Sequence, residues 1–437
     1  MLGRYELVAP IGRGGMAEVH LAVQRGPADF EKLVVIKVVH EHLASQPAFT
    51  GMLLDEARHA GMIRHPNVVE IYELGEEAGR HFIVMEYLEG EPLLDVLRLA
   101  GEGGARLDPL SAARVLADTA EGLDAAHRLR SPGGQPIELV HHDVSLGNIV
   151  VLYSGLVKLV DFGVAKAQRA SRGERVQGKL AYMAPEKVQD RAVDRRSDIW
   201  SLGCVLWEAL TLQRLFKGDS DADTVRQVVG AEIPRPSEID PDAPPELDPI
   251  VLRALERDPD RRYQTAKAMA ADLEEALRRL GYGARNDRIA QHMEAAFAAR
   301  IAARARVLME VSSRRRPSPA TLEAAFGEAH APAASTITST GESPIAPARA
   351  DASRDGRQLS PSAFAQPRPR QTGTTGTPHV FSVASLLDDP DASAEPIRPG
   401  DPLLLRDLPP ATPPAAPPAA EPETPPAATA AEFETPP

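Results

Sequence analysis

The sequence predicts an α+β fold with two lobes, a small one rich in strands and a larger helical one, and three observations support this fold class. Apolar residues alternate at strand spacing in the first part of the chain, whereas helical periodicity dominates after residue 90. From about residue 315 onward, Pro, Ala, Ser and Thr prevail. We therefore divide the chain into a folded domain over residues 5–280, a helical extension over 283–314 and a disordered tail over 315–437.

The strand-rich lobe begins with two apolar segments on either side of a glycine-rich turn. Residues 5–12 and 17–24 are predicted to pair around this turn, and residues 32–39 and 81–88 are predicted as two further strands. Between the last two, apolar residues recur at helical spacing from 49 to 63, which indicates an amphipathic helix. The first lobe is therefore predicted as a small sheet accompanied by one helix.

The helical lobe and the extension show apolar residues at helical spacing. Residues 111–129, 197–211 and 266–280 are predicted as the main helices of the lobe. In the further helical stretch over 285–313, one set of apolar residues recurs four apart, namely Ile289, Met293, Phe297 and Ile301. This spacing indicates one buried stripe, which either the second lobe or another chain could cover, so a homodimer stays an option.

The tail has a composition that cannot bury enough apolar surface to offset its chain entropy. A less polar island over 379–390 is either residual hydrophobicity or a docking segment that becomes ordered on a partner. Thr-Pro and Ser-Pro pairs occur at Thr377, Thr412, Thr424, Thr435, Ser318, Ser343 and Ser360. These pairs are either low-complexity sequence or phosphosites for phosphothreonine-reading partners.

The composition of the 437-residue chain excludes several classes of protein. The single cysteine, Cys204, rules out a disulfide within the chain, which fits the reducing cytoplasm. The first residues lack the apolar core of a secretory signal, and no apolar run approaches the ~18 residues of a membrane span. The net charge of −13 argues against a general nucleic-acid binder. We expect a cytoplasmic protein.

The glycine-rich turn is the first candidate for a phosphate-binding element. Gly12, Gly14 and Gly15 stand between two predicted strands, where they would let the backbone approach a polyphosphate with amide N–H donors. Ala17 stands where the G-x-G-x-x-G pattern has its third glycine. The turn is therefore either a phosphate-binding loop or a plain glycine turn.

Lys37 is the second candidate, because it lies in a strand whose other residues are apolar. Burying an unpaired ammonium group is costly, so Lys37 needs a partner. The alternatives are a structural salt bridge and a phosphate-binding lysine held by a glutamate on the adjacent helix. Glu56 is the candidate for that glutamate, ahead of Asp55.

Further motifs follow in a fixed order: HHDVSLGN at 141–148, DFG at 161–163, APE at 184–186 and SDIWSLG at 197–203. Together with the glycine-rich turn, Lys37 and Glu56, they resemble the motifs of protein kinases. The chain is most similar to bacterial serine/threonine kinases of the eukaryotic (Hanks) type. The resemblance covers about residues 5–275 and implies the two-lobed kinase fold with ATP and Mg²⁺ as cofactors.

The resemblance also assigns roles to individual residues. Asp143 would orient the hydroxyl of the substrate and accept its proton, and Asn148 and Asp161 would hold Mg²⁺ against the phosphates. Lys37, held by Glu56, would contact the α- and β-phosphates.

The adenine ring would lie between two apolar surfaces. Ile11, Val19 and Val35 would contact it on one side and Val150 on the other, and its edge would bond the backbone from Glu86 to Leu88. Met85 would guard a back pocket. Two structural roles complete the set, in which Asp198 braces the catalytic loop and Glu186 pairs with Arg262.

The loop around Asp143 departs from the family pattern in two ways. His142 stands where many kinases have an arginine that binds a phosphate on the activation segment, and a mostly neutral histidine is a poorer anion partner. The segment, residues 164–183, also offers few hydroxyls, and Ser171 is the obvious one. We therefore expect activity that depends little on phosphorylation of this segment.

The second departure is Ser145, which stands where serine/threonine kinases carry a lysine, while Lys179 stands where they carry a threonine. One hypothesis is that the two residue types are exchanged, so that the Lys179 ammonium reaches the γ-phosphate from the opposite wall. The alternative is that Lys179 is a solvated charge and the activity is weak.

The resemblance implies ATP-dependent phosphoryl transfer to Ser or Thr hydroxyls of proteins, in bacterial signalling and with autophosphorylation. A full activation segment that ends at Glu186 favours protein over small-molecule substrates. The alternative is a pseudokinase-like scaffold that binds nucleotide and partners with little catalysis. The presence of Lys37, Asp143, Asn148 and Asp161 argues against that alternative.

Overall fold

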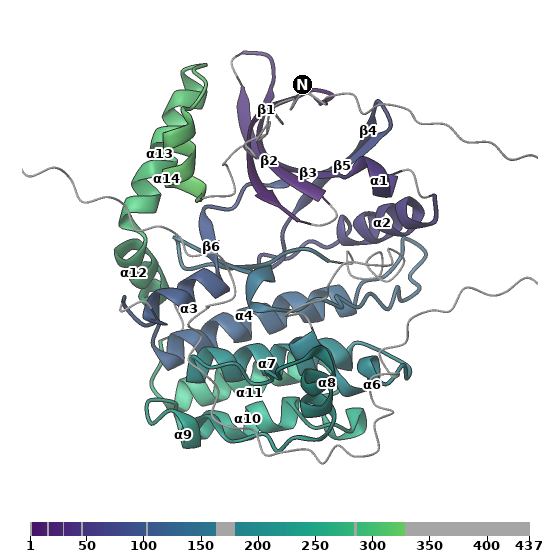
Figure 1. Ribbon diagram of the computed structural model, residues 1–437, viewed down its shortest axis with the longest axis vertical. Coiled ribbons are helices and arrows are strands. Elements are labelled where there is room, and N and C mark those ends of the chain that lie inside the picture. Colours follow the sequence, from purple (N-terminus) through teal and green to yellow (C-terminus); the bar gives the residue numbers. More distant parts are fainter. Residues whose placement is uncertain are drawn as a thin grey trace, which may run out of the picture. The chain divides into compact units, whose positions relative to one another are not determined.

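The computed structural model has the two-lobed α+β architecture that the sequence predicts (Figure 1). The structure describes residues 2–14, 17–28, 30–44, 47–101, 104–162, 180–283 and 286–327. In that part of the chain, no helix is both long and apolar enough to span a membrane.

A five-stranded antiparallel sheet with strand order β1-β2-β3-β5-β4 forms the first lobe. Its strands are β1 (Tyr5–Arg13), β2 (Ala17–Arg25), β3 (Glu31–Val39), β4 (Ile71–Glu77) and β5 (Arg80–Glu86). Val34 and Ile36 of β3 belong to the buried cluster on one face, which includes Phe82. Because side chains alternate along a strand, Val35 and Lys37 face the opposite side, where the nucleotide site is expected.

Two helices accompany the first sheet, and a second, smaller sheet lies where the chain passes from the first lobe to the second. The helices α1 (Glu41–Ala44) and α2 (Pro47–Ala60) follow β3, and α2 contacts β4. The smaller sheet has the order β6-β7-β8 and consists of β6 (Gly90–Pro92), β7 (Ile149–Leu152) and β8 (Val157–Leu159). It therefore joins the segment after β5 to the segment that follows Asp143.

Helices packed around α4 and α7 form most of the second lobe. They are α3 (Leu93–Gly101), α4 (Pro109–His127), α6 (Pro185–Val188), α7 (Arg196–Thr211), α8 (Asp221–Gly230), α9 (Pro236–Ile239), α10 (Asp248–Ala254) and α11 (Ala266–Arg279). Helix α4 begins where Asp108 accepts a hydrogen bond from the Ser111 N–H, with Pro109 in the first turn. Every residue of α7 from Ser197 to Thr211 is buried, which explains its largely apolar sequence.

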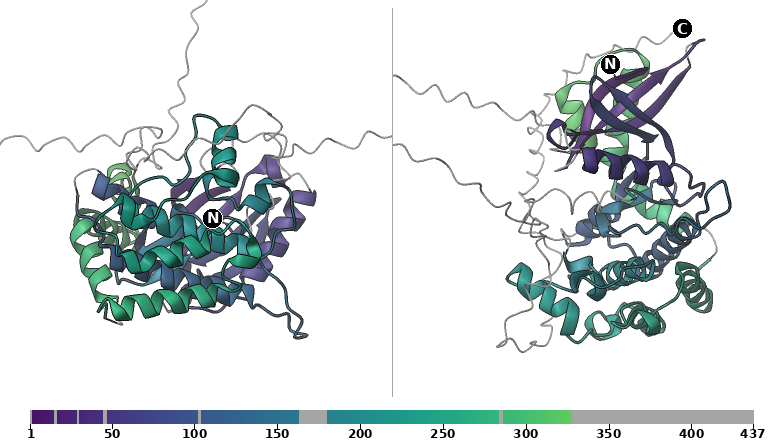
Figure 2. Two further views of the ribbon diagram at one scale, coloured as in Figure 1. Left: turned by 90° about the horizontal axis from the view of Figure 1, so that it is seen from below. Right: turned by 90° about the vertical axis from the view of Figure 1, so that its right-hand side faces the viewer.

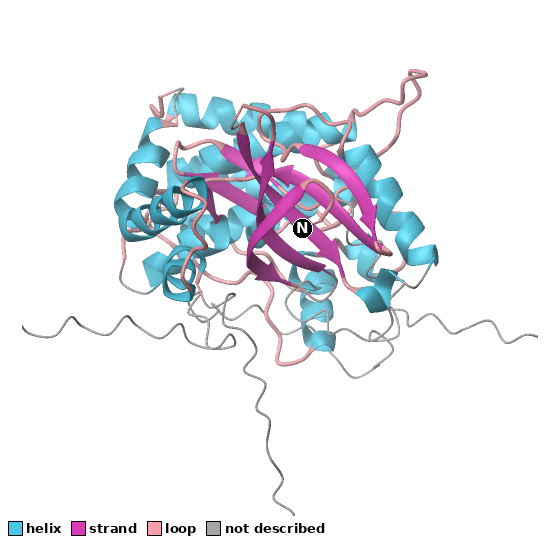
Figure 3. Cartoon of the chain, turned by 90° about the horizontal axis from the view of Figure 1, so that it is seen from above, coloured by secondary structure: helices cyan, strands magenta, loops and turns pink. Residues whose placement is uncertain are grey.

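The purple strands of the first sheet and the teal helices of the second lobe occupy separate regions in the right-hand view of Figure 2. Figure 3 shows the same arrangement from the side of the sheet, with the strands in front of the helices. One large buried cluster fills the second lobe and includes Trp200 and Trp207 of α7, whereas the smaller cluster around Phe82 lies within the sheet lobe.

The predicted helical stretch over 285–313 is divided at Phe297 into α12 (Asp287–Ala296) and α13 (Ala298–Ser312). The predicted stripe is buried, because Ile289, Met293 and Phe297 join the large cluster of the second lobe and Ile301 packs against it. The second lobe of the same chain therefore covers this stripe, and the stripe itself gives no reason to expect a homodimer.

A further helix, α14 (Pro319–Phe326), contradicts the expectation that the disordered tail begins at residue 315. Ser318 caps this helix by accepting a hydrogen bond from the Thr321 N–H at 3.1 Å, and Pro319 occupies its first turn. Leu322, Ala325 and Phe326 pack in a small apolar cluster with α13 and β2. The burial of these apolar side chains offsets the entropy of ordering the helix.

Candidate active site

Asp198, in the first turn of α7, holds the backbone of the loop that leads to β7. Its Oδ2 accepts hydrogen bonds from the His141 N–H at 2.7 Å and from His127 Nε2 at 2.8 Å, and its Oδ1 accepts one from the His142 N–H at 2.8 Å. Burial alone would raise the pKa of Asp198, but the hydrogen bond and the charge of His127 lower it to about 2. The carboxylate is therefore ionised at neutral pH and braces the loop just before Asp143.

His141 links this loop to the segment around Asp161. Its Nδ1 accepts a hydrogen bond from the Asp143 N–H at 3.2 Å, so the proton lies on Nε2, which donates to the Val160 carbonyl at 3.0 Å. Complete burial lowers the pKa of His141, in agreement with a neutral ring. The ring also contacts Phe162, with 4.4 Å between centroids. This role was not predicted from the sequence, where the only signal for it is the position two residues before Asp143.

The side chain of Asn148 fixes Asp143 from the other end of the loop. Its Nδ2 donates hydrogen bonds to the Asp143 carbonyl at 2.8 Å and to the Asp143 Oδ2 at 3.0 Å. Because Nδ2 is used in these bonds, Oδ1 is the atom of Asn148 that can bind a metal ion. The structure thus brings together the two residues to which the family resemblance gave adjacent roles.

His142 adopts a left-handed backbone conformation, with φ of 68°. For a residue with a side chain, this conformation is unfavourable by about 1 kcal/mol or more. Lys187 is only 8% exposed, and its Nζ donates a hydrogen bond to the His142 carbonyl at 2.8 Å. Together with Asp198, Lys187 holds the strained residue from both sides of its backbone. The sequence analysis did not single out Lys187, which directly follows the APE motif.

Lys37 of β3 is paired with Asp161, with 2.7 Å between Nζ and Oδ1. The side chain of Lys37 is 13% exposed and that of Asp161 is 36% exposed, so the pair lies at the edge of a space open to solvent. Asp161 has a φ of 64°, again in the left-handed region. The sequence predicted that Glu56 would hold Lys37, but the side chain of Glu56 lies outside the described part of the chain. The carboxylate that the structure shows beside Lys37 is Asp161.

The residues predicted to contact adenine come from strands of both sheets. Gly12 is opposite Val19 across β1 and β2, and Val35 is opposite Met85 across β3 and β5. Val150 lies in β7 of the smaller sheet. A cavity behind these strands is lined by Lys37, Ala57, Ala60, Val69, Ile71, Ile83, Met85, Asp161 and Phe162. Met85 thus lines a back cavity that also reaches Lys37 and Asp161.

The backbone and side chain of Glu86 are already engaged at the end of β5. Its N–H donates to the Glu70 carbonyl at 3.0 Å, and its side chain accepts from Lys158 Nζ at 2.6 Å and from the Glu70 N–H at 2.7 Å. An adenine edge would therefore have to use other backbone groups between Glu86 and Leu88. At the glycine-rich turn, the Gly14 N–H donates to the Ala17 carbonyl at 3.0 Å.

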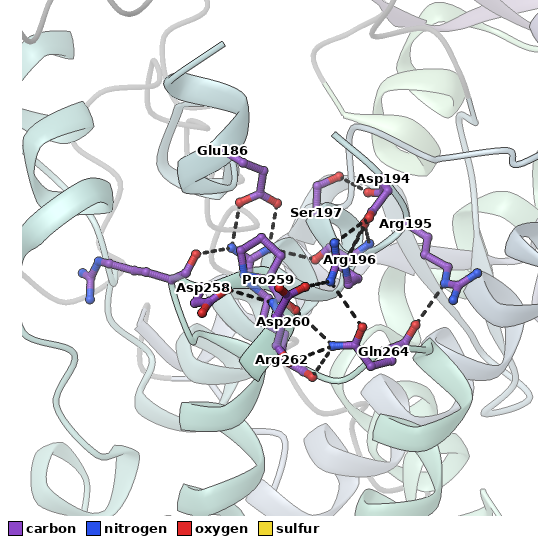
Figure 4. A network of polar contacts seen from close by, with 11 residues as sticks. Glu186, Asp194, Arg195, Arg196, Ser197, Asp258, Pro259, Asp260, Arg262 and Gln264 are labelled. Atoms are coloured by element: carbon purple, nitrogen blue, oxygen red, sulfur yellow. Dashed lines mark hydrogen bonds and ion pairs between the residues drawn. The ribbon is translucent and has the colours of Figure 1, made fainter. Parts of the chain in front are cut away.

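Glu186 and Arg262 form the pair that the family resemblance implied. Two hydrogen bonds of 2.7 Å join the guanidinium to the carboxylate, and both side chains are buried (Figure 4). Arg262 also donates to the carbonyls of Glu256, Arg257 and Arg196. Because every donor has a partner, this buried ion pair anchors the end of the activation segment to the helical lobe.

Four residues of the sequence-based site lie at positions that the structure does not describe in full. Gly15, Ser171 and Lys179 lie outside the described residues, as does the side chain of Glu56. Ser145 is described and is half-buried in the loop, two residues after Asp143. The exchange between Ser145 and Lys179 therefore stays a hypothesis.

The chain matches the protein kinase domain family over residues 5–273 and belongs to that family. Among curated proteins, it is 44% identical over 278 residues to tyrosine-protein kinase MasK of Myxococcus xanthus, which covers 63% of this chain and 43% of that protein. It is 37% identical over 279 residues to serine/threonine-protein kinase PknB of Mycobacterium tuberculosis, with 62% and 42% covered. The chain thus spans about two fifths of the length of the curated relatives it matches.

A further relative is the probable serine/threonine-protein kinase SCO3848 of Streptomyces coelicolor, 36% identical over 284 residues, with 63% of this chain and 40% of that protein covered. Among solved structures, the PknI kinase domain of Mycobacterium tuberculosis covers 63% of this chain and 97% of its own, at 24% identity and a TM-score of 0.48.

Proposed function

We propose that this protein transfers the γ-phosphoryl group of ATP to Ser or Thr hydroxyls of proteins in bacterial signalling, including hydroxyls of its own chain. The observation that carries the proposal is the arrangement around Asp143. Asn148 donates a hydrogen bond to this carboxylate, and Asp198 accepts the N–H groups of His141 and His142, which precede Asp143 in the loop. A fixed carboxylate in this place can align a hydroxyl and accept its proton, and phosphoryl transfer depends mainly on such positioning.

Membership of the protein kinase family implies the use of ATP and Mg²⁺, and the donor set of this chain fits that use. Asn148 Oδ1 and the Asp161 carboxylate are hard oxygen ligands, which Mg²⁺ prefers. Among the described residues, no group of three or more His, Cys, Asp or Glu side chains could hold a metal ion. That absence suits Mg²⁺ bound by one or two side chains together with substrate phosphates. Bound Mg²⁺ would neutralise charge on the phosphates.

Lys37 and Asp161 are paired at 2.7 Å and both line the back cavity. When the nucleotide binds, Lys37 would turn from Asp161 to the α- and β-phosphates, and Asp161 would be released to bind the metal ion. We retain Glu56 as the residue that would then hold Lys37. The pseudokinase alternative is the weaker one, because the chain has Lys37, Asp143, Asn148 and Asp161.

The direct test is transfer of labelled phosphate from ATP to the protein itself and to a generic basic protein, with and without Mg²⁺. The wild type should transfer phosphate, and Asp143→Asn should lose about 10²–10⁴-fold in rate while it still binds nucleotide. Equal transfer rates for the wild type and Asp143→Asn would contradict the role of Asp143. A wild type that shows no Mg²⁺-dependent phosphate transfer would contradict the proposed function.

Tyrosine is a second candidate acceptor, and two observations favour it. The relative with 44% identity is named a tyrosine-protein kinase, and Ser145 replaces the lysine that is usual in serine/threonine kinases. Serine or threonine is favoured by the names of the relatives at 36–37% identity. Phosphoamino-acid analysis of the labelled protein distinguishes the classes, because phosphotyrosine alone would exclude the serine/threonine proposal.

The exchange of Ser145 and Lys179 belongs to this proposal. If the Lys179 ammonium contacts the γ-phosphate, Lys179→Ala should lower kcat by about 10²-fold, as for other electrostatic clamps. Lys179→Arg, which keeps the charge, should retain more activity. Unchanged turnover in Lys179→Ala would show that this lysine is a solvated surface charge.

Some broader expectations also stay proposals. We place the activity in the cytoplasm, where ATP and Mg²⁺ are abundant, and we retain the Thr-Pro and Ser-Pro pairs of the tail as candidate phosphosites. Phosphothreonine-reading partners would bind phosphorylated threonines among them. Of these Ser-Pro and Thr-Pro pairs, the structure describes only the one at Ser318, which caps α14. Mass spectrometry of the purified protein decides whether any of these sites carry phosphate.

A further inference from the structure

Helices α13 and α14 pack against the sheet lobe, although they follow the helical lobe in sequence (Figure 1). Ala303, Val307 and Val311 are buried at four-residue spacing along α13 and contact Leu21 and Val23 of β2. This apolar contact attaches α13 to the outside of the first sheet.

The preceding helix, α12, is attached to the helical lobe instead. Ile289 and Met293 are completely buried in the core of that lobe. Asn286, just before α12, donates from Nδ2 to Asp118 Oδ2 at 2.8 Å and to the Gly155 carbonyl at 3.0 Å. Helices α12 and α13 therefore connect one lobe to the other by a second route, separate from the segment after β5.

A buried carboxylate lies where this second route passes the segment between the lobes. The Glu91 side chain in β6 is 2% exposed and is contacted by Arg300 at 2.8 Å and by Arg304 at 3.0 Å, both from α13. The Tyr153 hydroxyl also donates to Glu91. Two guanidinium groups and a hydroxyl compensate the cost of burying this charge.

Arg304 makes more contacts in this region than Arg300 does. Besides Glu91, it donates from Nη1 to the Gly90 carbonyl at 2.7 Å and from Nε to the Ala325 carbonyl of α14 at 3.0 Å. Its side chain is 12% exposed, compared with 37% for Arg300. One planar guanidinium thus ties together β6, α13 and α14, which a lysine could not do with the same geometry.

These contacts border the proposed nucleotide site on two sides. Ile11, expected on one face of the adenine, and Tyr87, next to the expected edge contacts, pack against the apolar cluster of α13 and α14. Pro92, next to Glu91, is the strand partner of Val150, expected on the other face. The residues that Arg304 holds are therefore directly connected to both faces of the site.

We propose that Arg304 is a positioning residue for nucleotide binding, which holds the segment after β5 and the end of β1 in the arrangement that accepts adenine. The inference rests on the proposed function, because it concerns the nucleotide that the kinase would use. It assigns to the helical extension a role in nucleotide affinity, in addition to its role in covering the core.

The test compares Arg304→Met with Arg306→Met in the full chain. Arg306 lies on the same helix, is exposed and contacts only the Ala302 carbonyl among the bonds described for its side chain. Arg304→Met should raise KM for ATP by about 10-fold and leave kcat within about 2-fold, whereas Arg306→Met should change neither. A fall in kcat without a rise in KM would overturn the proposal.

Nucleotide affinity is measured separately from phosphoryl transfer, by calorimetry with a non-hydrolysable ATP analogue and Mg²⁺ in an Asp143→Asn background. The dissociation constant should rise about 10-fold with Arg304→Met. Equal affinities of the two arginine variants would overturn this inference alone. An Asp143→Asn parent that binds no analogue would overturn both the inference and the proposed function.

A second measurement needs no substitution at Arg304. Coupling between two sites is reciprocal, so a nucleotide whose binding depends on α13 must in turn stabilise α13. In the wild-type protein, hydrogen exchange of the backbone amides of Ala298–Ser312 should slow when the ATP analogue binds. Exchange in α8 should not slow, because this helix is distant in sequence and contributes no residue to the apolar cluster of α13 and α14. Unchanged exchange in α13 at saturating analogue would contradict the proposal even if Arg304→Met did not fold.

Discussion

Two buried carboxylates, Asp198 and Glu91, hold neighbouring parts of the proposed site in different ways. Asp198 accepts two backbone N–H groups and one histidine, all from the helical lobe. Glu91 accepts two guanidinium groups from α13 and a tyrosine hydroxyl. Both are almost inaccessible, with each whole residue 1% exposed, so both carboxylates need complete compensation.

The difference between their donors indicates what each carboxylate controls. Backbone N–H groups cannot move without the chain, so Asp198 fixes the conformation of the catalytic loop itself. Guanidinium groups on long side chains join elements that are distant in sequence, so Glu91 fixes how α13 lies against β6. We therefore expect substitution of Asp198 to affect mainly kcat and substitution of Glu91 to affect mainly KM for ATP.

The largest effect is expected for Asp198→Ala. The N–H groups of His141 and His142 would lose a buried acceptor, and the strained loop before Asp143 would relax. We expect kcat to fall by about 10²-fold or more and unfolding free energy by about 3 kcal/mol, measured by initial rates and urea denaturation. Asp194→Ala, at a carboxylate 54% exposed, is the control. A rate within about threefold of wild type would show that the loop keeps its shape without this brace.

A smaller effect is expected for Glu91→Ala. Arg300 is 37% exposed and can turn to water, whereas Arg304 and the Tyr153 hydroxyl would both lose the Glu91 carboxylate as a partner. We expect unfolding free energy to fall by about 2 kcal/mol and KM for ATP to rise while kcat is nearly unchanged. Glu89→Ala, at an exposed glutamate two residues earlier, should have no such effect. If kcat fell as it does in Asp198→Ala, the division of roles between the two carboxylates would be wrong.

The pH dependence of the unfolding free energy should also distinguish the wild type from Asp198→Asn. Its pKa is about 2 in the folded protein and 3.8 in the reference state, so the unfolded chain binds the proton more strongly. The stabilisation, about 2 kcal/mol, is complete well above pH 4 and is lost as pH falls toward 2. Urea denaturation at pH 5 and at the lowest pH that permits folding should show the wild-type advantage over Asp198→Asn shrinking. An advantage that stays constant would contradict the lowered pKa.

How far the sequence predicted these features depends on how local their signals are. The strands and the main helices follow from apolar periodicity, and Asp198 follows from the SDIWSLG motif. Arg300 and Arg304 instead lie on an Arg- and Ala-rich helix and resemble ordinary solvated side chains in the sequence. Their partner Glu91 is more than 200 residues away in the chain, with a separation of 209 from Arg300. No local pattern can indicate such a pairing.

One other difference between the prediction and the structure has a physical reason that the sequence partly contains. Ser318 followed by Pro319 was interpreted as part of a disordered tail, although a serine cap with proline in the first turn is also a signal for a helix start. The packing of Phe326 against α13 and β2 decides between the two interpretations. The prediction that Lys37 needs a carboxylate partner is met by Asp161, whose Oδ1 lies 2.7 Å from Nζ, while the side chain of Glu56 lies outside the described part of the chain.

The smallest expected effect concerns the turn that attaches α12 to the helical lobe. Gly155 has a φ of 82°, and a Cβ there would lie 2.4 Å from the Asn286 carbonyl oxygen. Gly281 has a similar φ of 74° but open space around it, so Gly281→Ala carries the backbone strain without the clash. Gly155→Ala should therefore cost about 1 kcal/mol more than Gly281→Ala in urea denaturation.

The same pair of variants sharpens the comparison between the two carboxylates. If α12 is displaced at Gly155, α13 loses part of its anchor, and exchange of the α13 amides should become faster in Gly155→Ala only. KM for ATP should then rise slightly, by less than in Glu91→Ala, because the guanidinium contacts to Glu91 remain in place. Asp198 and its donors lie on other elements, so kcat should not change. A fall in kcat with unchanged KM would mean that the helical extension acts on the catalytic loop and not on the nucleotide site.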